Sequence, residues 1–136
     1  SPIRSATSAR NASARFADTH GKWGLVGNWG ITQRLPRRIG YPAAKRLSMT
    51  SRTIGAEEAL ALGLVDALAD EAGLDALVER FTGEILANSW HTNLHAKKFM
   101  LDTDGMSLAQ ALAHEQAHYP GFAPDYEERV ARFGKK

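Results

Sequence analysis

The segment from residue 20 to residue 35 contains the residue types that best suit chemistry on a bound small molecule. Glycine recurs at every third position, at Gly21, Gly24, Gly27 and Gly30, and an expected helix follows directly. Glycine permits positive φ and a close approach of the backbone, and the first turn of a helix carries unpaired N–H groups. This pattern is typical of a site for an anion or an acyl thioester, although it also suits a tight connection.

The one imidazole in this segment is His20, and a carboxylate, Asp18, lies two residues before it. Imidazole titrates near neutral pH and can act as a general acid or base. In an extended segment Asp18 points to the same side as His20 and could orient its ring. The alternatives are that His20 only forms a hydrogen bond within the turn and that Asp18 caps the turn.

A second motif that could carry chemistry is His114-Glu115-Gln116-Ala117-His118. On a helix, histidines at i and i+4 point to one side and can bind zinc, with the glutamate as a base. Pro124 stands where extended motifs of this kind have a third histidine, so no third ligand is obvious, although Asp125 or Glu127 could be proposed. A zinc hydrolase is therefore an alternative function.

Composition excludes several other classes of protein. The chain has 136 residues, 43% of them hydrophobic, a formal net charge of +2 and no cysteine. This charge is too small to indicate nucleic-acid binding, and disulfides, a thiolate nucleophile and a Cys-type zinc site are excluded. No apolar run approaches the ~20 residues of a membrane span. We therefore expect a single domain in the cytoplasm, with neither nucleic acid nor membrane as a partner.

The elements that must position these residues are predicted from hydrophobic spacing and from turn residues. Leu74, Leu77, Val78, Phe81 and Ile85 recur at spacings of three and four, which predicts an amphipathic helix over 74–88. A Ser107…Gln110 capping box predicts a helix over 108–118. The other predicted elements are strands over 14–17 and 64–69, and helices over 31–39, 42–50, 56–62, 94–101 and 125–133.

Four motifs in fixed order carry a resemblance to a known family. They are Thr32-Gln33-Arg34-Leu35 after the glycine segment, Leu35 to Gly40 as Leu-x-x-x-x-Gly, Ala43 to Thr50 before the place of a Leu-Thr-Gly turn, and Ala56 to Val65 as Ala-x-x-Ala-x-x-x-Gly-Leu-Val. In this order they resemble the crotonase (enoyl-CoA hydratase/isomerase) superfamily. The resemblance covers about residues 14 to 136 and matches only the second half of a crotonase chain.

The resemblance implies an α/β fold that is mostly helical here. Residues 14–70 would form the end of a crotonase-like β-β-α spiral, and residues 71–136 a C-terminal helical oligomerisation region, in a homotrimer or hexamer. Residues 1–13 carry little large apolar surface and are expected to be a disordered or non-native lead-in. Because two strands do not make a stable sheet alone, we expect further strands to come from a missing N-terminal half or from neighbouring subunits.

The resemblance also implies a reaction. In these hydratases two glutamates flank the α,β double bond of an acyl-CoA, and two backbone N–H groups stabilise the thioester enolate. The second glutamate aligns with His20, as the catalytic residue of this chain, whereas the first glutamate and the N–H groups belong to an upstream segment. The expected substrate-binding residues are Trp23, Gly24, Gly27, Trp29, Gly30, Phe133 and Lys136.

The function expected from this resemblance is that of an enoyl-CoA hydratase/isomerase acting on acyl-CoA thioesters. CoA would enter as part of the substrate, with no separate cofactor and no metal. The isolated chain is expected to be inactive. The resemblance assigns the N–H donors to the upstream segment, and each such preorganised donor contributes ~2.7–4 kcal/mol to stabilising the transition state. A non-catalytic oligomerisation module of the same descent is the alternative in a different class.

Overall fold

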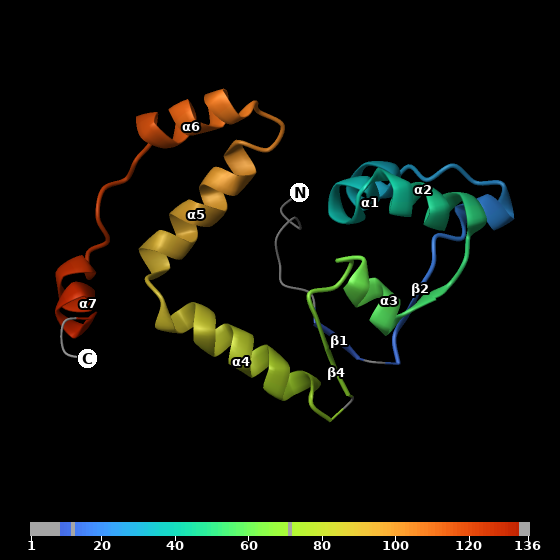
Figure 1. Ribbon diagram of the computed structural model, residues 1–136, viewed down its shortest axis with the longest axis horizontal. Helices are drawn as coiled ribbons and strands as arrows, with labels where there is room; N and C mark the ends of the chain where they lie inside the picture. The colour runs from blue at the N-terminus through green and yellow to red at the C-terminus, as the bar shows by residue number, and fades with distance from the viewer. Residues whose placement is uncertain (1–8, 12, 71, 134–136) are drawn as a thin grey trace. The chain divides into compact units, whose positions relative to one another are not determined.

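The computed structural model describes residues 9–11, 13–70 and 72–133, and their helices and strands are shown in Figure 1. The described residues divide into two compact units, one up to residue 79 and one from residue 80 onward. Helix α4 (Leu74–Ala87) begins in the first unit and ends in the second. Among the described helices, none combines the length and the apolar character that crossing a bilayer requires.

Two short strand pairs frame the first unit. Strand β1 (Ala9–Asn11) runs parallel to β4 (Ala67–Ala69), with Ala9 opposite Ala67. Strand β2 (Arg15–Phe16) runs antiparallel to β3 (Ile54–Gly55), with Phe16 opposite Ile54. The expected lead-in thus contains a strand at residues 9–11, whereas residues 1–8 and 12 lie outside the described residues.

Three α-helices and a 3₁₀ turn complete the first unit. The turn η1 (His20–Trp23) precedes α1 (Ile31–Ile39), α2 (Tyr41–Thr50) and α3 (Ala56–Ala61). The predicted bounds of α1 are confirmed, and the helix continues through Pro36. Since proline has no N–H, this residue removes one hydrogen bond of the helix without ending it.

The core of the first unit lies where α2, α3, β3 and the start of β4 meet. Its buried members are Leu47, Ile54, Ala59 and Val65, and five half-buried side chains pack against them: Phe16, Ile39, Leu62, Leu64 and Leu68. Leu47 comes from α2 and Ile54 from β3, so the antiparallel pair of strands is fastened to the helices through apolar contacts. This packing sets the position of the loop that follows β2.

The second unit consists of helices. The end of α4 is followed by α5 (Trp90–Asp102), α6 (Leu108–Ala117) and α7 (Tyr126–Phe133). The predicted capping box is confirmed: the Ser107 hydroxyl accepts a hydrogen bond from the Gln110 amide, and the Gln110 side chain accepts one from the Ser107 amide. Within described residues 80–133, Ser89 is the one buried residue, at 8% exposure.

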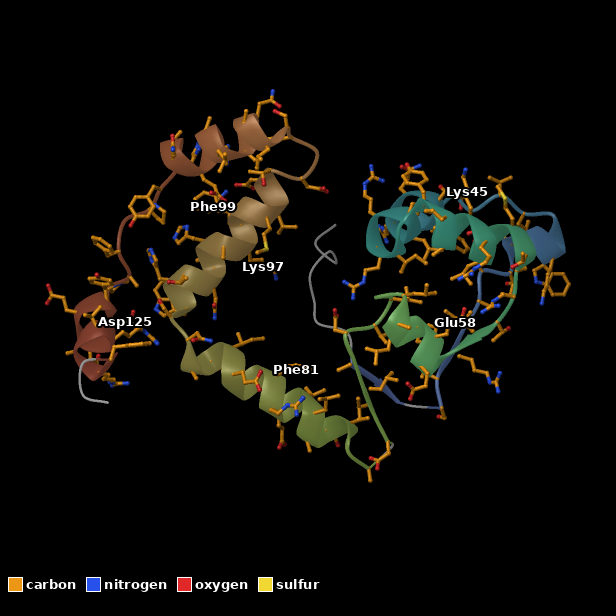
Figure 2. The ribbon with its side chains drawn as sticks, in the orientation of Figure 1. Lys45, Glu58, Phe81, Lys97, Phe99 and Asp125 are labelled. Carbon is orange, nitrogen blue, oxygen red and sulfur yellow. The ribbon has the colours of Figure 1, made fainter. Side chains whose placement is uncertain are left out.

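Polar contacts link the ends of this second unit. The Arg129 guanidinium donates to the Ala87 carbonyl at 3.0 Å and to the Asp125 carboxylate at 2.5 Å. Asp125 in turn lies 3.5 Å from the hydroxyl of Ser89, the N-cap of α5. The labels in Figure 2 mark Asp125 before α7 and Phe99 on α5. These contacts tie the start of α7 to the junction between α4 and α5.

Candidate functional site

The loop after β2 brings His20 against Asp18. The Nδ1 atom of His20 lies 2.6 Å from Asp18 Oδ1, and the His20 backbone N–H donates to the same oxygen at 3.2 Å. An ionised carboxylate only accepts hydrogen bonds, so Nδ1 carries the proton. In the neutral ring Nε2 is then the acceptor, and this is the nitrogen that could take a proton from a bound molecule. Asp18 therefore contacts the imidazole and also caps the turn through the His20 amide, so both of the roles that the sequence left open are present.

The two side chains of this pair differ in how far they are buried. The Asp18 side chain is only 8% exposed, whereas that of His20 is 30% exposed. Burial by itself raises the pKa of Asp18, but hydrogen bonds from the His20 ring, from the Ser48 side chain and from the His20 amide together lower that pKa below its usual value. Asp18 thus stays ionised at neutral pH beside a partly accessible imidazole.

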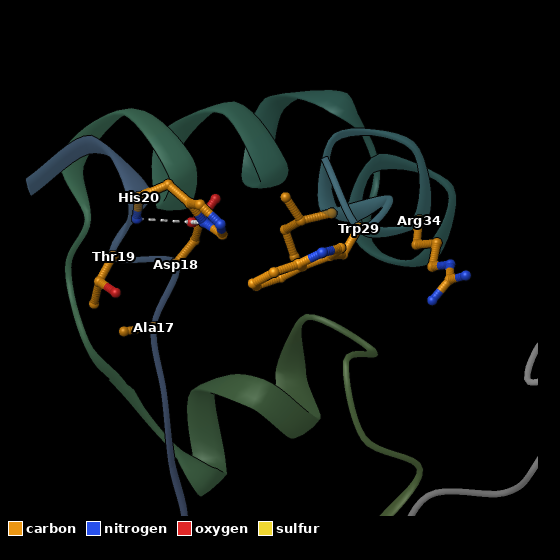
Figure 3. Close-up of a pocket in the computed structure, with 7 residues that line it drawn as sticks. Ala17, Asp18, Thr19, His20, Trp29 and Arg34 are labelled. Atoms are coloured by element: carbon orange, nitrogen blue, oxygen red, sulfur yellow. Dashed lines mark hydrogen bonds and ion pairs between the residues drawn. The ribbon is translucent and has the colours of Figure 1, made fainter. Parts of the chain in front are cut away.

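His20 and Asp18 form one wall of a pocket of about 340 Å³ (Figure 3). The ring centroids of His20 and Trp29 are 6.5 Å apart, in an edge-to-face arrangement. In Figure 3, Trp29 and Arg34 lie on the side of the pocket opposite Asp18 and His20. The full lining is Ala17, Asp18, Thr19, His20, Trp29, Ile31 and Arg34. The pocket therefore combines an imidazole, an aromatic face and a cation.

The glycines of the segment have separate roles. Gly24 and Gly30 have positive φ, of 65° and 91°, and Gly30 starts α1 without a side-chain cap. Gly27 is constrained by its neighbours: a Cβ there would lie 2.4 Å from Ile31 Cγ2 and 3.6 Å from His20 Nε2. The Ile31 side chain thus occupies space that a larger residue 27 would need.

The structure brings only some of the predicted substrate-binding residues together. Trp29 lines the pocket, whereas Trp23 is 75% exposed and does not line it. Phe133 ends α7 in the other compact unit, at 89% exposure, and Lys136 lies outside the described residues. A role for Phe133 and Lys136 in substrate binding therefore stays a prediction from the resemblance.

Sequence reasoning missed two residues that belong with this site. Arg34 lines the pocket, and its place one turn after Gly30 at the start of α1 was a signal that could have suggested it. The side chain of Ser48, on α2, contributes to the lowered pKa of Asp18. Nothing local in the sequence connects Ser48 to Asp18, because this effect depends on how α2 packs.

The histidine motif of α6 does not form a metal site. His114 and His118 have stacked rings 4.1 Å apart, and His118 Nδ1 lies 2.9 Å from the His114 carbonyl. Asp125, one of the suggested third ligands, is bonded to Arg129 instead. Over the parts of the chain that the structure describes, no group of three or more metal-binding side chains is suitably placed to hold an ion. The geometry thus gives no support to a zinc hydrolase.

One protein family matches nearly the whole chain. The family described as "Enoyl-CoA hydratase/isomerase" matches residues 6–133. The chain is 29% identical over 124 residues to "Probable enoyl-CoA hydratase 1, peroxisomal" of Arabidopsis thaliana, covering 88% of this chain and 47% of that protein. It is 33% identical over 79 residues to "Short-chain-enoyl-CoA hydratase" of Clostridium acetobutylicum, covering 58% and 30%. The chain spans about half the length of such relatives or less.

Solved structures agree in fold. An enoyl-CoA hydratase from Bacillus anthracis superposes with a TM-score of 0.86 at 29% identity, over 93% of this chain and 50% of that one. A protein from Thermobifida fusca YX, solved in complex with CoA, superposes with a TM-score of 0.75 at 26% identity, over 94% and 47%. The arrangement of strands and helices described above is therefore that of known hydratase structures.

Proposed function

Because the chain belongs to the enoyl-CoA hydratase/isomerase family, we propose that it supplies the proton-transfer part of a site that acts on acyl-CoA thioesters. The observation that carries this proposal is the 2.6 Å contact between His20 Nδ1 and Asp18 at the wall of a pocket. It leaves the second ring nitrogen, Nε2, as the base. Support for the substrate class comes from the family and from a structural neighbour solved in complex with CoA.

The proposed chemistry is proton transfer at the carbon beside the thioester carbonyl. Nε2 of His20 accepts a proton from that carbon and returns it to the same carbon or, in an isomerisation, to the γ carbon at the other end of the extended enolate, and the negative charge rests meanwhile on the thioester oxygen. Trp29 and Ile31 offer an apolar surface to the acyl group, and Arg34 a positive charge at its edge. Isomerisation requires both removal and return of the proton, whereas hydration requires its delivery to the carbon beside the carbonyl after water has added to the next carbon.

The enolate needs two N–H donors and the resemblance assigns these to an upstream segment. Since each such donor contributes ~2.7–4 kcal/mol, we expect the 136-residue chain to bind acyl-CoA without measurable turnover. A trimer or hexamer built through the C-terminal helices, and a cytoplasmic location, remain predictions. The Arabidopsis relative carries "peroxisomal" in its name.

A second candidate function is a non-catalytic assembly module. It is favoured by one observation: the helices of described residues 80–133 bury almost no apolar side chain within the chain, and Leu112, Phe122 and Val130 are each at least half exposed. Such faces normally meet a partner. In this alternative the chain would associate with itself and would not bind acyl-CoA.

Calorimetric titration with crotonyl-CoA and with free CoA, after light scattering, tests the proposal. We expect saturable binding of crotonyl-CoA that weakens in Trp29→Ala, while Trp90→Ala serves as the control, because Trp90 is an exposed tryptophan of α5 outside the pocket. Equal loss in both variants would contradict the pocket assignment. Stable oligomers without any binding would favour the assembly module.

His20→Ala tests the role of the imidazole separately from binding. In a chain that binds crotonyl-CoA, the saturated analogue butyryl-CoA carries two protons beside the thioester carbonyl, and their slow exchange with deuterated water, followed by NMR, reports proton transfer without needing full turnover. We expect this exchange to depend on His20 and to be unchanged in His118→Ala, which alters an exposed histidine of the other unit. Exchange that persists in His20→Ala would contradict the assignment of His20 as the base.

A further inference from the structure

Two pockets of the first unit are neighbours that share one wall. The first pocket, of about 340 Å³, is the one beside His20, and the second has a volume of about 350 Å³. Three residues, Ala17, Asp18 and Ile31, line both pockets and therefore stand between them. Opening this wall would roughly double the space that a molecule bound beside His20 can enter.

The second pocket is suited to a hydrocarbon chain. Of its charged lining residues, Arg52 is paired with Glu58 and Asp18 with His20, which leaves Arg15 as a third charge in the lining. A concave apolar surface takes up alkyl groups, because their burial removes apolar area from water. The apolar lining of this pocket comes from Phe16, Ile31, Leu35, Leu47 and Leu64.

Ile31 is the wall residue that decides whether the two pockets connect. Ala17 projects only a methyl group, and Asp18 is held by hydrogen bonds from the His20 ring and amide. Ile31 is the first residue of α1 and is branched at Cβ, which restricts its χ1 rotation. A Cβ at Gly27 would overlap Ile31 Cγ2, so this methyl group lies directly against the backbone of the loop. The side chain therefore cannot turn aside without moving the loop.

The same side chain lies close to the base. The position that a Cβ of Gly27 would take is 3.6 Å from His20 Nε2 and in contact with Ile31 Cγ2. The proton-accepting nitrogen and the Ile31 methyl group thus flank one point of the loop. The ring of Trp29 lies 6.5 Å from the ring of His20 in the same pocket. An acyl group whose reacting carbon is beside Nε2 therefore meets Ile31 within a few carbon atoms.

From this arrangement we propose that Ile31 is a specificity-determining residue: its side chain closes the second pocket to the acyl group and restricts the substrate to short acyl chains. The substrate class in this inference rests on the proposed function. The physical reason is that methylene groups increase affinity only where they leave water. Each buried methylene group strengthens binding about fourfold. With Ile31 in place, the further methylene groups of a long acyl chain stay in solvent.

Calorimetric titration with butyryl-CoA and octanoyl-CoA tests this inference. We expect the wild-type chain to bind the two thioesters with similar affinity, because the four additional methylene groups of octanoyl-CoA remain hydrated. In Ile31→Ala the pockets are joined, and octanoyl-CoA should bind roughly tenfold or more tightly than butyryl-CoA. Circular dichroism before each titration checks that the variant keeps its helices.

Further variants locate the effect. Ile31→Val keeps the branch and the γ2 methyl group and should keep most of the restriction. Ile31→Met is unbranched and flexible and should admit the longer chain, even if Ile31→Ala does not fold. Leu64→Phe, added to Ile31→Ala, fills the second pocket and should abolish the preference for octanoyl-CoA. The control is Ile85→Ala, which removes an exposed isoleucine of α4 and should change neither affinity.

The inference and the proposed function fail in different ways. Butyryl-CoA binding with the same chain-length ratio in wild type, Ile31→Ala and Ile31→Met would overturn the inference and leave the proposed function intact. A wild-type chain that already strongly prefers octanoyl-CoA would overturn it as well. No binding of either thioester to any variant would overturn the proposed function, and this inference with it.

Discussion

Helices α1, α2 and α3 begin at Gly30, Gly40 and Gly55 without any side-chain cap, whereas α5 and α6 begin at Ser89 and Ser107, whose hydroxyls accept amide hydrogen bonds. The first three helices contribute residues to a buried core. In the described part of the second unit, burial is confined to Ser89. The two units therefore contain helices that are stabilised in different ways.

The difference teaches what each kind of helix needs. In the first unit, tertiary packing compensates for weak helix starts, because apolar burial outweighs the ~1 kcal/mol that a good N-cap contributes. In the second unit, caps and ion pairs such as Lys98 with Asp102 act locally, while the apolar faces stay exposed. Local signals in the sequence are thus enough to form these helices. Burial of their apolar faces requires a surface that the helices do not provide for one another.

The largest expected effect comes from the core. Ile54 is 2% exposed, so Ile54→Ala should reduce the free energy of unfolding by about 2–5 kcal/mol. Leu112 on α6 is 51% exposed, and Leu112→Ala should cost less than about 1 kcal/mol. Urea denaturation followed by circular dichroism measures both. If Leu112→Ala costs as much as Ile54→Ala, the second unit is packed against a partner surface in solution.

A smaller effect is expected at the pocket, where two positions are coupled. Gly27→Ala places a Cβ against Ile31 and should cost about 1–3 kcal/mol. Ile31→Ala removes the atom that is in the way, so the double variant should be more stable than the sum of the single variants predicts. A double-mutant cycle by urea denaturation measures the coupling. Simple additivity would mean that residue 27 and residue 31 do not compete for space.

The caps of the second unit are tested by Ser107→Ala. The loss of the capping box of α6 should cost ~1 kcal/mol of helix stability and reduce the helical circular dichroism signal. Gln116→Ala, an exposed change near the end of the same helix, is the matched control. If Ser107→Ala has no greater effect than the control, α6 is held by contacts other than its local cap.

The smallest expected effect is acid sensitivity of the second unit. A hydrogen bond from Lys98 lowers the pKa of Asp102, and one from Arg129 lowers the pKa of Asp125, from the ordinary value of 3.8. A lowered folded-state pKa stabilises the folded chain above pH 3.8, and this contribution is lost as the pH falls through the folded-state pKa. Asp125→Asn should remove part of this dependence in a circular dichroism titration.

A matched variant makes the acid experiment specific. Glu115→Gln changes an exposed carboxylate of α6 and should leave the acid transition of the second unit nearly as in the wild type. The ion pairs concerned are partly exposed and are screened by solvent, so the effect is expected to be small. An acid transition that is identical in Asp125→Asn and wild type would show that this carboxylate does not tie down α7.

Most helices were predictable because their signals are local. The bounds of α1 follow from Gly30 and Gly40, and α6 follows from its capping box. The start of α5 was placed four residues late, since residues 90–93 lack a clear apolar period and the Ser89 cap was overlooked. Strand β1 was missed because its short polar segment acquires a partner only through pairing with β4.

The sequence by itself determined the family, the helices and the presence of His20 and Asp18 near each other, because motifs, caps and close spacing are properties of neighbouring residues. The tertiary structure decided which side chains share the pocket. Trp29 and His20 line the same pocket while Trp23 is left in solvent, and Ser48 of α2 contributes to the lowered pKa of Asp18. These outcomes depend on how separate elements pack around Ile54 and its neighbours, and no local spacing encodes the resulting distances.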